Sequence, residues 1–143
     1  MEESSSLLET VGFRLGKLGQ SATAKFAQRM APAGLRPNLV GLLALAAARP
    51  EASQLDLGTA FGVGASAVVP LVDELEERGL VRRERDPDDR RRQRVRVTPA
   101  GVQALSAAAE DAIAVDAALL AGLDAQERRI FAELLAKICP PLP

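Results

Sequence analysis

Residues 63–101 constrain the fold of this chain more than any other stretch. A helical pattern that ends at Gly79 is followed by two short runs in which apolar and charged residues alternate. The sequence Asp-Pro-Asp-Asp at 86–89 separates the two runs, and these are strong turn residues. Two alternating runs around such a turn predict a β-hairpin. A helix joined to a basic hairpin is typical of a winged helix-turn-helix, which indicates binding to duplex DNA.

Arginine is concentrated in this hairpin. Residues 82–96 contain eight arginines and four acids, so the window carries a net charge of +4 in a chain whose total is -1. The remainder of the chain is therefore mildly acidic, at -5. A basic patch on an acidic body is typical of a DNA-binding module. The alternative interpretation is a hairpin whose charges are merely solvated and salt-bridged.

Composition argues against catalysis and against secretion. The chain has no histidine and one cysteine, Cys139, so it cannot form a disulfide framework, a conventional zinc site or a histidine-based triad. We expect no cofactor, no metal and no enzymatic activity. The first residues lack the basic and apolar regions of a signal peptide, and no apolar run reaches the ~18 residues of a membrane span. These features predict a cytoplasmic protein with no membrane partner, in which Cys139 is a buried or inert thiol.

The rest of the chain is mainly helical by pattern, which gives a fold class that is mainly α with a small β-hairpin wing. Apolar residues recur at steps of three and four, and capping residues delimit the segments. Helices are expected at residues 6–30, 37–48, 53–61, 66–78, 98–121 and 124–139. The expected core positions include Leu39, Leu42, Leu43, Leu55, Leu57, Val68, Val72 and Leu75.

Several motifs resemble the MarR family of bacterial transcription regulators. The hairpin reads RDPDDRR at 85–91, and the second strand continues as VRVTPAG at 95–101. Segments at 35–37, 54–58 and 72–81 also match the family, and the resemblance continues to the helix that opens at 124–127. The resemblance therefore covers nearly the whole chain, and the wing is its most specific part.

The resemblance implies an architecture and a function. A winged helix-turn-helix lobe at 35–98 would lie between an N-terminal dimerisation helix at 1–34 and C-terminal dimerisation helices at 99–143. The protein would be a homodimer that represses transcription by binding a palindromic operator in double-stranded DNA. A small phenolic or anionic ligand would release it from that operator.

The candidate DNA-binding residues come from the resemblance and from the chemistry of the wing. Arginines at the hairpin tip suit the minor groove, where negative potential is concentrated. We expect Asp89 to hold one of these guanidinium groups in a bidentate pair, and Arg94 to contact phosphates from the outer face of the hairpin. The candidates are Asn38, Ser53, Gln54, Ser66, Ala67, Val69, Pro70, Asp89, Arg90, Arg91, Arg92 and Arg94.

The recognition helix departs from the family's pattern. Ala67 and Val69 replace the usual threonines. Pro70 replaces a frequent arginine, and Glu74 replaces a commonly basic residue. The two apolar side chains could contact thymine methyl groups, but they cannot form a bidentate hydrogen bond with a base. Because proline interrupts a helix interior, we predict a late helix start with Ser66 as the cap.

Two further hypotheses concern function. Arg14 and Lys17 on the first helix could pair with the carboxylate of a ligand, or they could be solvated surface charges. The apolar recognition helix also leaves open a winged-helix dimer that has lost specific DNA reading. Such a protein would serve as a ligand- or protein-interaction module.

Overall fold

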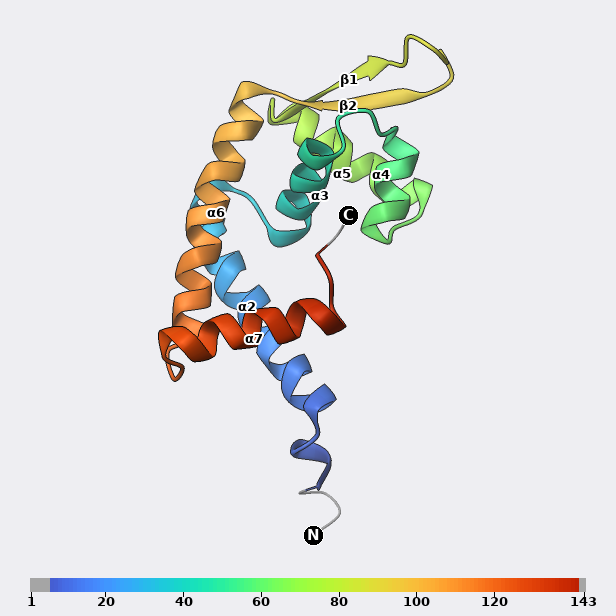
Figure 1. Cartoon of the computed structure of the whole chain (residues 1–143). Coiled ribbons are helices and arrows are strands. Elements are labelled where there is room, and N and C mark those ends of the chain that lie inside the picture. The colour runs from blue at the N-terminus through green and yellow to red at the C-terminus, as the bar shows by residue number, and fades with distance from the viewer. Residues whose placement is uncertain (1–5, 142–143) are drawn as a thin grey trace. The chain divides into compact units, whose positions relative to one another are not determined.

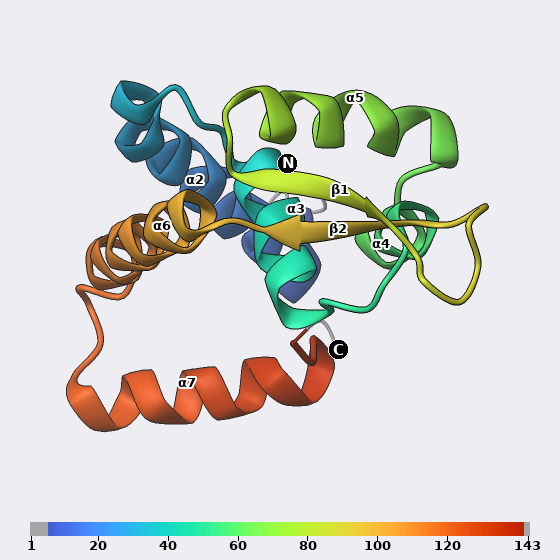
Figure 2. The same cartoon turned by 90° about the horizontal axis from the view of Figure 1, so that it is seen from above.

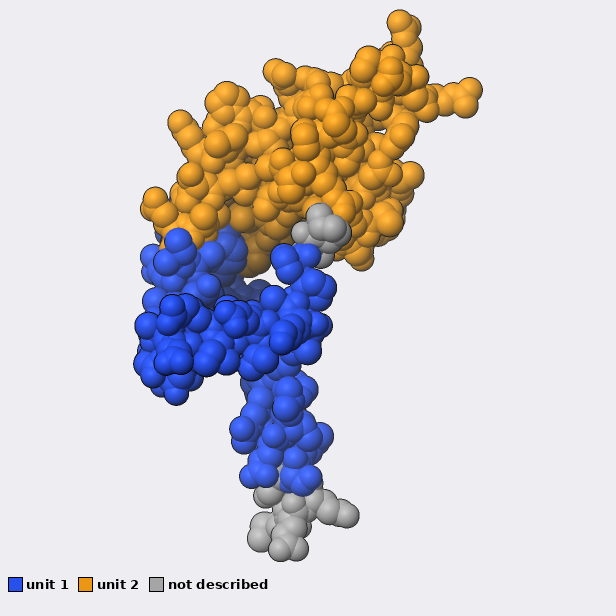
Figure 3. Space-filling model, in the orientation of Figure 1, with its two compact units in different colours: residues 1–34, 111–141 blue, residues 35–110, 142–143 orange. Residues whose placement is uncertain are grey.

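A computed structural model describes residues 6–141 of the chain (Figure 1). Residues 1–5 and 142–143, the outer ends of the predicted dimerisation segments, lie outside the described residues. The chain divides into two compact units (Figure 3). The terminal unit combines the residues up to Gly34 with Asp111–Pro141, and the central unit contains Leu35–Glu110.

The central unit is a small helical bundle with a β-hairpin. Its elements are α3 (Pro37–Ala48), α4 (Gln54–Phe61), α5 (Ala65–Glu77), β1 (Val81–Arg85), β2 (Gln93–Val97) and the first part of α6 (Pro99–Leu119). The strands are antiparallel, with Val81 opposite Val97 and Arg85 opposite Gln93. The hairpin packs beside α3, α4 and α5 (Figure 2). The predicted fold class, mainly α with a small hairpin wing, is confirmed.

The core of the central unit is built from aliphatic side chains, as the shortage of aromatic residues requires. Its largest fully buried members are Leu39, Leu42, Leu43, Leu57, Val68, Val72, Leu75, Val81 and Val95. The prediction that Leu55 belongs to the core is wrong, because this residue is 57% exposed. Leu55 and Leu57 are two residues apart on α4, about 200° around a helix, so only one of them can face the core.

Helix α5 begins earlier than predicted. Gly64, in an extended conformation, is its N-terminal cap, and Ser66 already lies in the first turn. Gly62 ends α4 with a positive φ of 81°, and the buried Val68 closes the first helical turn by donating its N–H to the C=O of Gly64 at 3.1 Å. Packing of Val68 in the core therefore sets the helix start, and Pro70 lies in the helix interior. Pro70 is exposed, so its ring faces solvent rather than the core.

The terminal unit contains long helices with few buried side chains. Its elements are α2 (Val11–Met30), a short 3-10 helix (Ala31–Ala33), the second part of α6, and α7 (Ala125–Ile138). The helix predicted over residues 6–30 is interrupted: residues 6–8 are helical, but Thr10 caps α2 and the helix starts again at Val11. The Thr10 hydroxyl accepts a hydrogen bond from the Phe13 N–H and donates one to the Leu7 C=O. This exchange separates a preceding helical turn from α2.

The predicted capping box at Asp124 is present at the start of α7. At the other end of α7, Cys139 is the C-terminal cap and is exposed, so the expectation of a buried thiol is wrong. Proline at 140 follows directly, which is why the helix stops there. Across residues 6–141, no single helix combines the length and the apolar character that a membrane span needs.

Candidate nucleic-acid interface

Most of the wing arginines are neutralised within the chain. Five of the eight in residues 82–96 form ion pairs with carboxylates, namely Arg82, Arg83, Arg92, Arg94 and Arg96. The other three, Arg85, Arg90 and Arg91, are exposed and form no ion pair with any residue between 6 and 141. The uncompensated positive charge of the wing therefore lies around its turn.

Arg94 is held inside the protein. Its side chain is only 14% exposed, pairs with Asp86 at 3.1 Å between Nε and Oδ2, and also pairs with Glu51. An antiparallel bridge between Ser53 and Arg94 brings β2 against the chain that enters α4, beside these carboxylates. Arg94 is therefore enclosed by carboxylates of the fold, and the expected position on the open outer face of the hairpin is wrong. The pKa of Asp86 is held below its usual range, mainly by the hydrogen bond from the Asp88 N–H and then by Arg94.

Asp89 organises the turn through the backbone. Its Oδ1 accepts a hydrogen bond from the Arg91 N–H at 3.0 Å, and its C=O accepts one from the Arg92 N–H at 2.9 Å. The N–H of Asp86 donates to the C=O of Arg92 at 3.0 Å, which closes the loop. Asp89 thus fixes the loop that carries Arg90 and Arg91, rather than holding a guanidinium group as expected.

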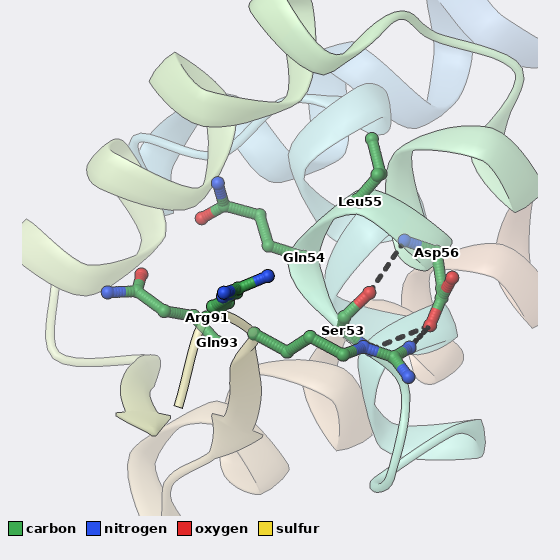
Figure 4. Close-up of a pocket in the computed structure, with 7 residues that line it drawn as sticks. Ser53, Gln54, Leu55, Asp56, Arg91 and Gln93 are labelled. Atoms are coloured by element: carbon green, nitrogen blue, oxygen red, sulfur yellow. Dashed lines mark hydrogen bonds and ion pairs between the residues drawn. The ribbon is translucent and has the colours of Figure 1, made fainter. Parts of the chain in front are cut away.

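A groove of about 500 Å³ runs between the start of α4 and the wing (Figure 4). It is lined by Ser53, Gln54, Leu55, Asp56, Arg91, Arg92 and Gln93. Arg92 crosses from the wing to Asp56, with 2.5 Å between Nη2 and Oδ2. Three groups thus lower the pKa of Asp56: the Ser53 hydroxyl, the Ser53 N–H and, less strongly, Arg92. This ion pair ties the wing to the helix-turn-helix.

Two of the candidate DNA-binding residues in the groove make hydrogen bonds that stabilise the fold. Ser53 is 5% exposed, and its hydroxyl accepts the Asp56 N–H as the predicted capping box requires. Gln54 is half-buried, and its Oε1 accepts a hydrogen bond from Nε of Arg83 at 2.8 Å. The Ser53 hydroxyl is therefore committed to the cap, and Gln54 retains its amide N–H donors for a ligand.

The candidates on α5 share one exposed side. Ser66, Ala67, Val69 and Pro70 are all exposed, and Val69 keeps 39% of its surface accessible. Asn38, in the first turn of α3, is also exposed. A surface of this kind offers methyl and methylene groups to a base edge, together with one hydroxyl from Ser66.

Sequence reasoning missed two arginines that pair with the acids of α5. Arg36 makes a bidentate pair with Glu74, at 2.7 Å and 2.6 Å. Arg83 is 17% exposed and pairs with Asp73 at 2.6 Å and with Glu76 at 2.8 Å. These contacts lower the pKa of Glu74, chiefly through Arg36, and that of Glu76, chiefly through the Arg83 N–H. Four carboxylates at 73, 74, 76 and 77 beside a single neighbouring base, Arg78, are the signal that further partners come from other elements.

A second groove, of about 330 Å³, lies within the terminal unit. It is lined by Leu15, Leu18, Gly19, Ala22, Asp116, Leu119, Leu120, Phe131, Ala132 and Leu135. The ligand-binding candidates Arg14 and Lys17 are exposed on α2, and neither lines this groove. The groove is therefore apolar, with one carboxylate.

Comparison with known proteins agrees with this geometry. Residues 34–92 match the model of the MarR family. The chain is 35% identical over 134 residues to a Thauera aromatica protein assigned as a transcriptional regulatory protein for the hcr operon, covering 93% of this chain and 81% of the relative. It is 33% identical to the transcriptional regulator HosA of Escherichia coli, over 87% of this chain and 91% of that protein. The structure of CouR from Rhodococcus jostii RHA1, bound to p-coumaroyl-CoA, superposes with a TM-score of 0.77 at 31% identity, covering 94% of this chain and 95% of CouR.

The fold, the basic wing and these relatives agree on one family and one kind of activity. The central unit has the winged helix-turn-helix arrangement, and the matched residues span its helices and the hairpin turn. The relatives that cover most of the chain are transcriptional regulators. The chain belongs to the MarR family and is a DNA-binding transcriptional regulator.

Proposed function

We propose that this protein is a homodimeric repressor that binds a palindromic operator through its wing tip and the exposed side of α5. The observation that carries the proposal is the position of the unpaired arginines. Arg85, Arg90 and Arg91 surround the wing turn, while the other wing arginines form ion pairs with carboxylates of the same chain. Guanidinium groups on a projecting hairpin suit the narrow, strongly negative minor groove of A·T-rich DNA.

The surface of the terminal unit supports a homodimer. The structure describes twelve exposed large apolar side chains, and nine of them belong to this unit. They are Leu7, Leu8, Val11, Phe13, Ile113, Ile130, Leu134, Leu135 and Ile138. Only Met30 and Val115 are buried apolar residues of the described part of the unit. Since full burial of such a side chain stabilises by about 1.5–3 kcal/mol, a second copy that covers them would be strongly favoured.

Two-fold symmetry would then determine the form of the DNA site. A symmetric dimer presents two identical winged helices, so it matches a palindrome whose half-sites lie about 34 Å apart. Ala67 and Val69 would select thymine through its methyl group, and the wing would select a narrow minor groove. We therefore expect sequence choice to rest largely on apolar contact and DNA shape. A regulator of this kind would act in the cytoplasm, where its operator is.

Release by a small molecule completes the proposal. CouR, which resembles this chain, is bound to p-coumaroyl-CoA, an aromatic acyl thioester. The apolar groove of the terminal unit would suit an aromatic ring better than a charged group. Arg14 and Lys17 remain candidates for an anionic part of such a ligand, from exposed positions next to Leu15 and Leu18.

The test is a fluorescence anisotropy titration with the promoter DNA beside the protein's own gene. We expect nanomolar binding to that duplex and much weaker binding to a scrambled duplex, with light scattering giving the mass of two chains. Arg91→Ala should weaken binding more than tenfold and lower the slope of log K against log salt by about 0.9, because one phosphate-type contact is lost.

Arg82→Ala is the matched control, since Arg82 is also an exposed arginine of the hairpin but is already paired with Glu84 at 2.8 Å. It should change the affinity little. Equal micromolar binding to both duplexes would contradict the proposal, and would favour a protein- or ligand-interaction module. Equal effects of the two substitutions would show that the wing tip is not in the groove.

A further inference from the structure

The side of α5 that would meet DNA is acidic. Between Ala65 and Glu77 the helix has no lysine or arginine, and it carries carboxylates at 73, 74, 76 and 77. At 100° per residue, positions 73, 74 and 77 fall on the same side as the exposed Ser66 and Pro70. Carboxylates that face phosphates repel them, so a DNA-binding helix of this composition needs cations from other elements.

Glu74 brings such a cation to the helix. Both of its oxygens are taken by Arg36, at 2.7 Å and 2.6 Å from Nη1 and Nη2, and Arg78 adds a contact at 3.1 Å. Arg36 is the N-terminal cap residue of α3, so its backbone is anchored in a different helix. Around the α5 axis, Glu74 lies between Pro70 and Ala67, on the side that the proposed function places against DNA.

The guanidinium group of Arg36 is held in place by Glu74 but still has N–H donors available. A guanidinium carries five N–H donors, and Glu74 takes two of them. The Arg36 side chain remains 47% exposed. Arg36 can therefore donate to a DNA phosphate while it stays paired with Glu74, as a bridge between the helix and the backbone.

We propose that Glu74 is a positioning residue that holds Arg36 over α5 as a DNA phosphate contact, a role that rests on the proposed function of this surface. The pair replaces the basic residues that α5 lacks. Because Glu74 fixes the guanidinium before DNA arrives, less side-chain freedom is lost on binding. The carboxylate thus strengthens DNA binding although its own charge opposes it.

The direction in which one substitution changes the affinity for DNA tests this inference. Glu74→Gln removes a negative charge from the DNA-facing side and keeps the shape of the side chain. Electrostatics alone predicts tighter binding, whereas loss of the bidentate pair predicts weaker binding, by about fivefold. Glu77→Gln is the matched control: Glu77 is exposed on the same side of α5 and forms no ion pair within residues 6–141. It should bind DNA at least as tightly as wild type.

The readout is operator anisotropy at several salt concentrations, with thermal melting to confirm folding. Arg36→Ala, which leaves α5 unchanged, should lower the salt slope by about 0.9. Adding Glu74→Gln to Arg36→Ala should no longer weaken binding, because only the repulsion between the carboxylate and the phosphates is then removed. Glu74→Gln alone should weaken binding and reduce the slope. Binding by Glu74→Gln as tight as or tighter than wild type would overturn the inference, as would an unchanged slope in Arg36→Ala. If wild-type protein does not discriminate the operator at all, the proposed function fails instead.

Discussion

Replacing Gly101 with alanine tests how the wing is fastened to α6. A Cβ atom at this position would lie 2.2 Å from the backbone oxygen of Leu80 and 2.7 Å from Cγ1 of Val97. Real Cβ contacts are essentially never shorter than 3.0 Å, so the first separation must grow by at least 0.8 Å. The Leu80 oxygen cannot move alone, because it accepts a hydrogen bond from the Thr98 N–H at 3.0 Å.

The expected cost follows from these contacts. Overpacking of a close-packed site costs about 1–3 kcal/mol. Weakening the Thr98–Leu80 hydrogen bond adds about 0.5–1.5 kcal/mol. Alanine recovers about 1 kcal/mol relative to glycine in a helix. The free energy of unfolding should therefore fall by about 2 kcal/mol.

Urea unfolding followed by circular dichroism measures this change, since the chain has no Trp or Tyr for fluorescence. The protomer concentration must be the same for every variant, because the stability of the proposed dimer would depend on it. Gly122→Ala is the control: nothing lies within 4 Å of a Cβ there, so its stability should stay within about 0.5 kcal/mol of wild type. Equal midpoints for the two variants would refute the close approach at Gly101.

Two other predictions concern the central unit. Leu57→Ala removes a side chain that is 0% exposed and should lower the free energy of unfolding by about 2–5 kcal/mol; a loss below about 1 kcal/mol in urea unfolding would contradict the core assignment. In the folded protein the pKa values of four carboxyl groups, those of Asp56, Glu74, Glu76 and Asp86, are below their ordinary values. The contribution of these groups to stability is therefore complete above the ordinary carboxyl pKa near 4. It is lost as the pH falls through the lowered pKa values of the folded state. With no histidine in the chain, stability should be nearly flat from about pH 6 to 8 and should fall below about pH 4. Asp56→Asn should show a shallower fall than wild type, and identical pH profiles would count against the Asp56 contacts.

Local sequence patterns determined most of the secondary structure. The Asp-Pro turn with alternating flanks gave the hairpin, and Pro37 with Arg49-Pro50 gave the bounds of α3. The capping boxes at Ser53 and Asp124 are present where the spacing predicts them. These features depend on residues close together in the chain, so periodicity and capping chemistry are sufficient to locate them.

Contacts between distant residues decided the details of the candidate interface. Arg92 pairs with Asp56, Arg83 with Asp73 and Arg94 with Glu51, and these partners come from the helix-turn-helix rather than the hairpin. The start of α5 was likewise set by the packing of Val68. A run of arginines in the sequence shows only that cations are present. Which of them remain available to DNA depends on which carboxylates the fold brings within reach, and that is settled only when the helices and the hairpin pack together.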